Sequence, residues 1–310
     1  MKRFQPLLAS PAPDNLNDLV FPLLTSAKYD GVRAFVQKGV LLSRNLKPIK
    51  NEQLQAMCNS ELLEGLDGEI ISGPPTTKDV FQQSQSLCSR ADRHIGSYDR
   101  FYVFDVIDAE RPFSERLRAL QQRKKLLSGG DFVHFVKQIK VNDVKELLEV
   151  ETLCLNEGFE GLMLRSVDGL YKYGRSTTKE GILLKLKRFA HDEAEVFGAY
   201  EQLENTNEAT TDERGYKKRS SHKANMVGKG TLGGFHVKML TGPFKGVACD
   251  VGTGWTDAER VALWADWNKK GMRLFNKQMG MLRLKYQLIG SKDRPRFPIA
   301  DGWRSKDDTS

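Results

Sequence analysis

The chain has 310 residues, a length that suits two domains better than one and allows each to bury a sizeable core. Apolar residues at 39% and charged residues at 28% are typical of a soluble globular protein and argue against a membrane-embedded one. The formal net charge of +8 favours a polyanionic partner such as nucleic acid, because a basic surface releases counterions from a phosphate backbone.

Hydrophobic period predicts strands and helices in the first part of the chain. After "KYDGVR" (28–33), residues 34–43 are predicted as a hairpin that turns at Lys38 and Gly39. The pattern predicts further strands at 66–71, 101–106, 161–165 and 181–189.

Two helices stand out in the same part. One is predicted from Asn142, a suitable N-cap, to Gly158, a suitable stop. The other, "SERLRALQQRKKLL" (114–127), is interpreted as a solvated basic face over three leucines, with contact to DNA as a weaker alternative. The first part is therefore expected to be mixed α and β.

The composition changes near His191, so a domain boundary is placed between residues 189 and 190. Beyond it, strands are predicted at 195–200, 234–239 and 281–289, and a small β-barrel with one helix fits them. A capping box of Thr256 and Glu259 marks the start of that helix. The polar stretch at about 203–230 has almost no apolar residues and is predicted to be a long surface loop.

The four cysteines, Cys58, Cys88, Cys154 and Cys249, lie far apart and form no C-x-x-C pair. This spacing argues against zinc ribbons and disulfide scaffolds, so buried free thiols in a reducing compartment are expected. No apolar run approaches the roughly 20 residues that span a bilayer, and the start does not have the pattern of a signal peptide. We expect a cytoplasmic protein with no membrane contact, and nothing indicates more than a monomer.

Five short segments of the first part carry the candidate chemistry. They are "KYDGVR" (28–33), "LDGEI" (66–70), "YVFDVID" (102–108), "EGLML" (160–164) and "LLKLK" (183–187). Residues two apart on a strand point the same way, so Lys185 shares a face with Lys187, and Asp67 shares one with Glu69. Taken singly, each segment has an ordinary structural explanation. The charged residues could form the solvent-exposed face of a strand, and Phe104 could belong to the core.

All five segments in this order resemble the covalent nucleotidyltransferase superfamily of polynucleotide ligases and messenger-RNA capping enzymes, whose first motif reads K-x-D-G-x-R. Two more segments, "SRNLKPIKN" (43–51) and "PRFPIADGWR" (295–304), and the polar loop resemble the small ATP-dependent DNA ligases of phages and large DNA viruses. That resemblance implies an α+β fold. An adenylation (nucleotidyltransferase) domain, ATP-grasp-like with antiparallel sheets and helices, would span 1–189, and an OB-fold β-barrel would span 190–310.

The resemblance also implies roles for individual residues. Lys28 would attack the α-phosphate of ATP, with Lys185 and Lys187 as catalytic cations and Glu160 and Glu69 as candidate ligands of Mg²⁺. The expected nucleotide-binding residues are Asp30, Arg33, Glu69, Phe104, Glu160, Lys185, Lys187, Arg296 and Arg304. The expected DNA-binding residues are Arg33, Arg44, Lys217, Lys218 and Arg219. Phe104 would stack on adenine, and Arg296 and Arg304 would orient pyrophosphate.

The nucleophile needs a neutral amine, and at a reference pKa of about 10.4 fewer than ~1 in 1000 lysines are neutral near pH 7. We therefore expect Lys185, Lys187 and a divalent cation to disfavour the ammonium form of Lys28.

Three functions are compatible with the sequence. The first is ATP-dependent joining of 5′-phosphate and 3′-hydroxyl ends in nicked duplex DNA through a lysyl-AMP intermediate. The second is another covalent nucleotidyl transfer, either RNA ligation or GTP-dependent RNA capping. The third is a non-catalytic protein that binds nicks through its basic surface.

Overall fold

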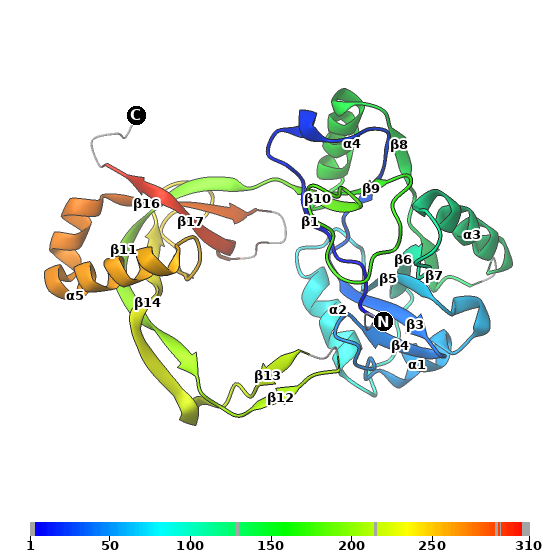
Figure 1. Cartoon of the computed structure of the whole chain (residues 1–310), viewed down its shortest axis with the longest axis horizontal. Helices are drawn as coiled ribbons and strands as arrows, with labels where there is room; N and C mark the ends of the chain where they lie inside the picture. Colours follow the sequence, from blue (N-terminus) through cyan, green and yellow to red (C-terminus); the bar gives the residue numbers. More distant parts are fainter. Residues whose placement is uncertain (1–3, 128–129, 214–215, 289–290, 292, 306–310) are drawn as a thin grey trace. The chain divides into compact units, whose positions relative to one another are not determined.

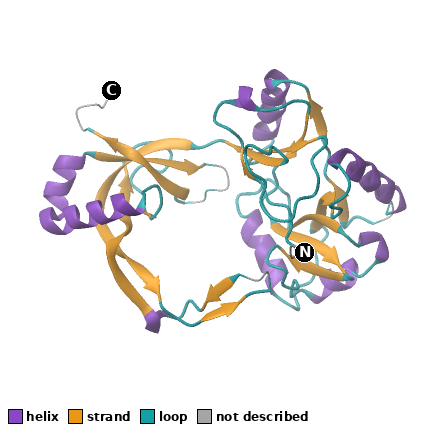
Figure 2. Cartoon of the chain, viewed as in Figure 1, coloured by secondary structure: helices purple, strands orange, loops and turns teal. Residues whose placement is uncertain are grey.

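The computed structural model describes residues 4–127, 130–213, 216–288, 291 and 293–305. Its contacts divide the chain into two compact units. The first runs to Lys187 and also includes Glu213 and Tyr216, while the second holds the other residues from Arg188 onward. Each unit mixes helices with strands, which confirms the predicted α+β class (Figures 1 and 2).

The described part of the first unit contains two five-stranded sheets. One has the strand order β1-β10-β9-β2-β8, with bounds Ser10–Pro11, Leu183–Lys187, Gly161–Ser166, Leu23–Ala27 and Ile139–Val141. The other has the order β4-β3-β5-β6-β7, with bounds Val40–Ser43, Val32–Gln37, Leu66–Ile71, Arg100–Val106 and Val133–Phe135. The β1–β10 and β6–β7 pairs are parallel, and the other pairs are antiparallel.

Helices cover both sheets, each through an apolar face. Their bounds are Glu52–Cys58 (α1), Val80–Ser89 (α2), Phe113–Leu126 (α3) and Val144–Asn156 (α4). Leu54 of α1 and Leu87 of α2 are fully buried in one core with Phe101 of β6. Leu147 of α4 is buried in another core with Leu162 of β9. Short 3-10 turns lie at Leu16–Asp18, Glu61–Leu63 and Lys223–Asn225.

The strands predicted at 66–71, 101–106 and 161–165 are present, as is the 34–43 hairpin. The segment 181–189 is shorter than predicted, because β10 ends at Lys187 and a new strand starts at Ala190. The N-cap of α4 is Asp143 rather than Asn142, since the Asp143 carboxylate accepts the hydrogen bond of the Glu146 backbone N–H. Asn142 instead donates to the Glu146 side chain from one residue further out.

The prediction that the arginines of 114–127 are solvated is wrong for Arg116. Its side chain is 1% exposed and pairs with Asp105 of β6, with 2.7 Å between Nε and Oδ1. Charge alone could not locate this arginine, because a buried guanidinium is stable only where a carboxylate meets it.

The described part of the second unit contains a five-stranded sheet and a helical segment that kinks at Gly271. The strand order is β15-β14-β11-β16-β17, with bounds Ala248–Val251, Met226–Met239, Ala190–Asn205, Met281–Gln287 and Arg296–Arg304. Helix α5, Asp257–Met279, packs on β14 and β11 and begins at the predicted capping box of Thr256 and Glu259. The pairing found among these described strands closes no barrel. Ile289, the end of a predicted strand, lies outside the described residues.

The prediction of a loop at 203–230 is wrong for most of that stretch. Strands β11 and β14 remain paired out to Asn205 and Met226, and β12 (Ala209–Thr211) pairs with β13 (Lys217–Arg219). These segments are polar and exposed on both faces, so they lack the apolar alternation that usually marks a strand. Backbone hydrogen bonding alone defines them.

All four cysteines are buried and free, as predicted. Burial raises the pKa of Cys58 and of Cys88 to about 12 and that of Cys249 to about 11. Among the described residues, no helix has the length and apolar character needed to cross a membrane.

Candidate active site

Strand register brings Lys28, Glu160 and Lys187 of the first unit together where β2 and β10 end and β9 begins. Lys28 follows β2, and its backbone N–H donates to the Gly161 carbonyl at 2.9 Å. Gly161 is in turn the register partner of Lys187 at the end of β10. Only glycine fits there, because its φ is +143° and a Cβ would lie 2.1 Å from the Leu186 carbonyl oxygen.

Two lysine amines share one carboxylate at this edge. Glu160 Oε2 lies 2.7 Å from Lys28 Nζ and 2.9 Å from Lys187 Nζ. The Glu160 side chain is only 5% exposed, so water screens these ion pairs weakly. Lys28 Nζ also donates to the Tyr29 carbonyl at 3.1 Å.

A second close approach places Glu69 beside the "KYDGVR" segment. The Gly31 backbone N–H donates to Glu69 Oε1 at 3.2 Å, and a Cβ on Gly31 would lie 2.4 Å from the Ile70 carbonyl oxygen. The glycine of this motif is therefore required by the passage of β3 next to β5. Asp30, between Lys28 and Gly31, adds negative potential at the Lys28 amine.

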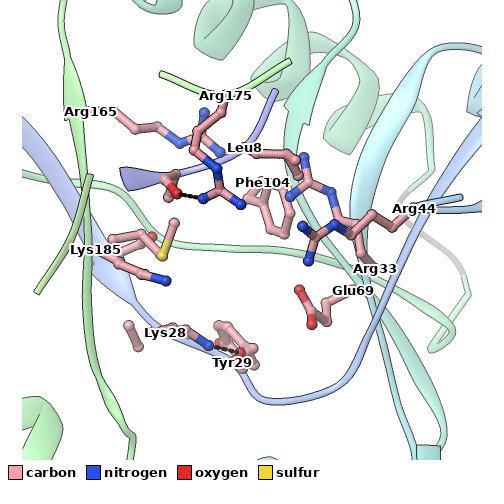
Figure 3. A pocket seen from close by; sticks show the side chains of 14 residues that line it. Leu8, Lys28, Tyr29, Arg33, Arg44, Glu69, Phe104, Arg165, Arg175 and Lys185 are labelled. Atoms are coloured by element: carbon pink, nitrogen blue, oxygen red, sulfur yellow. Dashed lines mark hydrogen bonds between the residues drawn. The ribbon is translucent and has the colours of Figure 1, made fainter. Parts of the chain in front are cut away.

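These elements surround a cavity of about 210 Å³ (Figure 3). Its lining residues are Leu8, Ala9, Ser26, Ala27, Lys28, Tyr29, Arg33, Arg44, Glu69, Phe104, Met163, Arg165, Arg175 and Lys185. Six of these are basic and one is acidic, a balance suited to a small polyanion, and two are aromatic, Tyr29 and Phe104. Lys28 and Tyr29 lie at one end of the view, and Arg165 and Arg175 at the other.

The buried carboxylate of Asp67 holds the Arg33 guanidinium. Its Nε and Nη2 lie 2.6 Å from the two oxygens of Asp67, which is fully buried and also accepts a hydrogen bond from the Tyr171 hydroxyl at 2.6 Å. The same guanidinium lies over the Phe104 ring, 4.6 Å from its centroid. One edge of the Arg33 fork is thus committed to Asp67, whereas the sequence suggested a fork directed at DNA phosphate.

The carboxylates dominate the charge at Lys28. Burial lowers the pKa of Lys28, but Glu160 and Glu69 together outweigh burial and leave that pKa above its ordinary value. Burial raises the pKa of Glu160, yet Lys28 and Lys187 outweigh it and hold that pKa low. Burial lowers the pKa of Lys185 and of Lys187, and neighbouring cations, Lys28 among them, add to the effect. The sequence led us to expect that neighbouring cations would disfavour the ammonium form of Lys28. The side chains of the structure instead favour it.

The expected metal ligands, Glu160 and Glu69, both interact electrostatically with Lys28. Burial raises the pKa of Glu69 above its ordinary value, although Lys28 and Arg33 pull it down. Within the described chain, no group of three or more His, Cys, Asp or Glu side chains is arranged to hold a metal. Mg²⁺ does not need such a group, because it is often bound by one or two carboxylates together with substrate phosphates and water. Glu160 and Glu69 fit that donor set.

The remaining predicted residues lie in the second unit. Arg296 and Arg304 are at opposite ends of β17, and Arg304 Nη1 lies 2.7 Å from Glu193 Oε1. Lys217, Lys218 and Arg219 form β13 and are exposed.

Two basic cavity residues, Arg165 and Arg175, escaped the sequence analysis. Arg165 follows the "EGLML" segment, and the alternation that places Met163 at the cavity also places Arg165 there, so this signal was available. Arg175 lies in an irregular segment without any period, and its guanidinium donates to the Ala9 carbonyl.

The geometry can be compared with known proteins. Residues 6–187, more than half of the chain, match the family model described as ATP dependent DNA ligase domain. The chain belongs to this family. The solved structure of Chlorella virus DNA ligase-adenylate is 31% identical and superposes with a TM-score of 0.54, covering 98% of this chain and 99% of the viral one.

Curated relatives of this ligase-family chain are longer. The DNA ligase of Acidianus ambivalens is 27% identical over an alignment of 270 residues that covers 76% of this chain and 40% of that protein. The DNA ligase of African swine fever virus (strain Badajoz 1971 Vero-adapted) is 28% identical over an alignment of 178 residues that covers 53% of this chain and 41% of that protein. The chain spans about two fifths of the length of these curated relatives.

Proposed function

We propose that this ligase-family chain is an ATP-dependent DNA ligase that seals 5′-phosphate/3′-hydroxyl nicks in duplex DNA. The observation that carries the proposal is Lys28 Nζ, which faces a cation-lined cavity and lies 2.7 Å from a buried carboxylate. A lysine amine at the wall of a cavity, with cations placed to meet phosphate oxygens, is the arrangement that covalent nucleotidyl transfer needs.

In the first step, Lys28 Nζ releases its proton to solvent and, as the neutral amine, attacks the α-phosphorus of ATP. A nitrogen–phosphorus bond forms, the bond to pyrophosphate breaks, and lysyl-AMP remains. Lys185 and Lys187 stabilise the charge that develops on the phosphate oxygens. Glu160 and Glu69 would hold Mg²⁺, which neutralises phosphate charge when bound. Phe104 provides the surface for the adenine ring.

In the later steps, AMP passes from Lys28 to the 5′-phosphate of the nick, and the 3′-hydroxyl displaces AMP as the strand is joined. Arg44 is the proposed contact for the 5′-phosphate, with Arg33 as a second candidate, because a guanidinium matches phosphate oxygens two at a time. The exposed residues Lys217, Lys218 and Arg219 are proposed to contact the duplex backbone.

The proposal extends to the domains. We assign residues 1–189 to an adenylation domain and 190–310 to an OB-fold domain that carries the DNA contacts at about 203–230. Two observations support this assignment. The second unit contains a five-stranded sheet, and the superposition on the viral ligase covers nearly the whole of both chains. A monomer acting in the cytoplasm is the simplest form of such an enzyme.

The test is to incubate the protein with Mg²⁺ and α-phosphate-labelled ATP or GTP and to run denaturing gels. Wild type should take up label from ATP, and nicked duplex should release the label as sealed strand appears. Lys28→Ala should take up none, while Lys140→Ala, which removes an exposed lysine of β8, should behave as wild type. Label from GTP would indicate capping, label that single-stranded RNA alone releases would indicate RNA ligation, and no label at all would leave only a binding function.

A further inference from the structure

Two arginines of the first unit share one buried aspartate. Asp105 accepts hydrogen bonds from Arg116 at 2.7 and 3.1 Å and from Arg165 Nη1 at 2.7 Å. Asp105, Arg116 and Arg165 are 0%, 1% and 3% exposed. One carboxylate neutralises one guanidinium, and Arg116 already meets Asp105 through two nitrogens. Arg165 is therefore a surplus buried cation, which is costly unless another partner meets it.

Apart from Asp105, Arg165 contacts two aromatic rings and lines the cavity. Its guanidinium lies over Phe113 and Phe104, 4.6 and 5.4 Å from the ring centroids, and the residue lines the cavity (Figure 3). Arg165 Nε is a buried donor with no hydrogen-bond acceptor among the described residues. Native structures rarely leave such a donor unpaired, so a ligand acceptor beside Phe104 would complete the site.

Strand register tells which part of a nucleotide can reach Arg165. On β9, Gly161 lies beside Lys187 and Lys28, whereas Arg165 pairs with Leu183 and lies four residues further on. At about 3.3 Å per residue this is about 13 Å along the strand. If the phosphates meet Lys28 and Lys187, Arg165 lies at the opposite end, where the base would stack on Phe104.

We propose that Arg165 is a specificity-determining residue that donates a hydrogen bond to a ring nitrogen of the adenine stacked on Phe104. This inference rests on the proposed function and adds a base contact to it. Burial lowers the pKa of Arg165, and Arg33 and Arg116 lower it further. Asp105 and Asp67 oppose this but leave the pKa below its ordinary value, so the cation gains from a new acceptor.

The experiment measures self-adenylation against the concentration of ATP and of its 1-deaza, 3-deaza and 7-deaza analogues, each of which lacks one ring-nitrogen acceptor. Arg165→Met leaves the Asp105–Arg116 pair intact and keeps a long side chain in place. We expect it to raise the half-saturating ATP concentration about tenfold or more, as for one hydrogen bond to a charged group. For one of the three analogues, the same substitution should have no effect.

The matched control is Arg116→Met, which disturbs the same aspartate but not the cavity lining. It should lower thermal stability and change the response to all four nucleotides by one common factor. A common factor for Arg165→Met across all four nucleotides would overturn the inference.

Wild type provides a second test that needs no substitution, because it should use one deaza analogue about tenfold less well than ATP. Equal use of all three analogues and ATP would also overturn the inference. Failure of wild type to form any adenylate would instead overturn the proposed function.

Discussion

At Lys28, a single amine experiences burial, which favours the neutral form, and three carboxylates, which favour the charged form. The carboxylates dominate, so the pKa of Lys28 is raised and its ion pairs add stability that is complete below pH 10.5 and lost as the pH rises through the higher folded value. The nucleophile is thus stored as an ammonium ion. Any group that neutralises Glu160 or Glu69 releases it toward the reactive form.

Replacing Glu160 with glutamine should therefore lower the pKa of Lys28, because the ammonium ion loses its nearest partner while burial remains. Reaction of Lys28 with cyanate across a pH series, read by mass spectrometry of its peptide, should reach half-extent at a lower pH than in wild type. Glu157→Gln, at an exposed position three residues earlier, should leave the midpoint unchanged. Identical midpoints for Glu160→Gln and wild type would contradict this account.

Among the elements, those with an apolar face were the ones that sequence could locate. Strand β5 and the start of α5 follow from alternation and a capping box. Strands β12 and β13 do not, because both are exposed on both faces and neither shows an apolar alternation. Within the site, β9 alternation could have indicated Arg165. The buried place of Arg116 depends on Asp105, a partner that no local pattern identifies.

Helix α5 contains one residue that is not helical. Gly271 has φ +66° and ψ +168°, a conformation that residues with a Cβ rarely adopt, although no atom would block the Cβ itself. Gly271→Ala should lower the free energy of unfolding of the second unit by about 1 to 3 kcal/mol through backbone strain alone. Urea denaturation measures this value. Asn268→Ala, one turn earlier and exposed, should cost nothing, and equal behaviour of both variants would exclude backbone strain as the cause.

At the scale of the whole molecule, adenylation and DNA contact are assigned to different segments and can be separated. Asn205 and Met226 are register partners, so a two-residue Asn-Gly turn can replace residues 206–225. We expect self-adenylation to be unchanged, because no cavity residue is removed. Nick binding should weaken, and its salt dependence should become shallower by up to about 3 in log–log slope for three lost phosphate contacts.

Two further variants test whether the DNA contacts are separate from adenylation. Lys217, Lys218 and Arg219 changed together to alanine should reproduce the binding defect in the intact fold. Lys269→Ala with Lys277→Ala removes charge from α5 instead and should alter the salt slope little. If the shortened chain lost adenylation and nick binding together, the assignment of these two activities to different segments would be wrong.

The buried cysteines can serve as probes of local unfolding. Cys58 and Cys88 lie in the core of the first unit and Cys249 in that of the second, and in the folded state their thiols are protonated at neutral pH. A thiol reagent can modify each one only when its surroundings come apart, because the thiolate is the reactive form. The order in which these three peptides acquire a mass label during mild denaturation would therefore reveal whether the two units unfold together or one before the other.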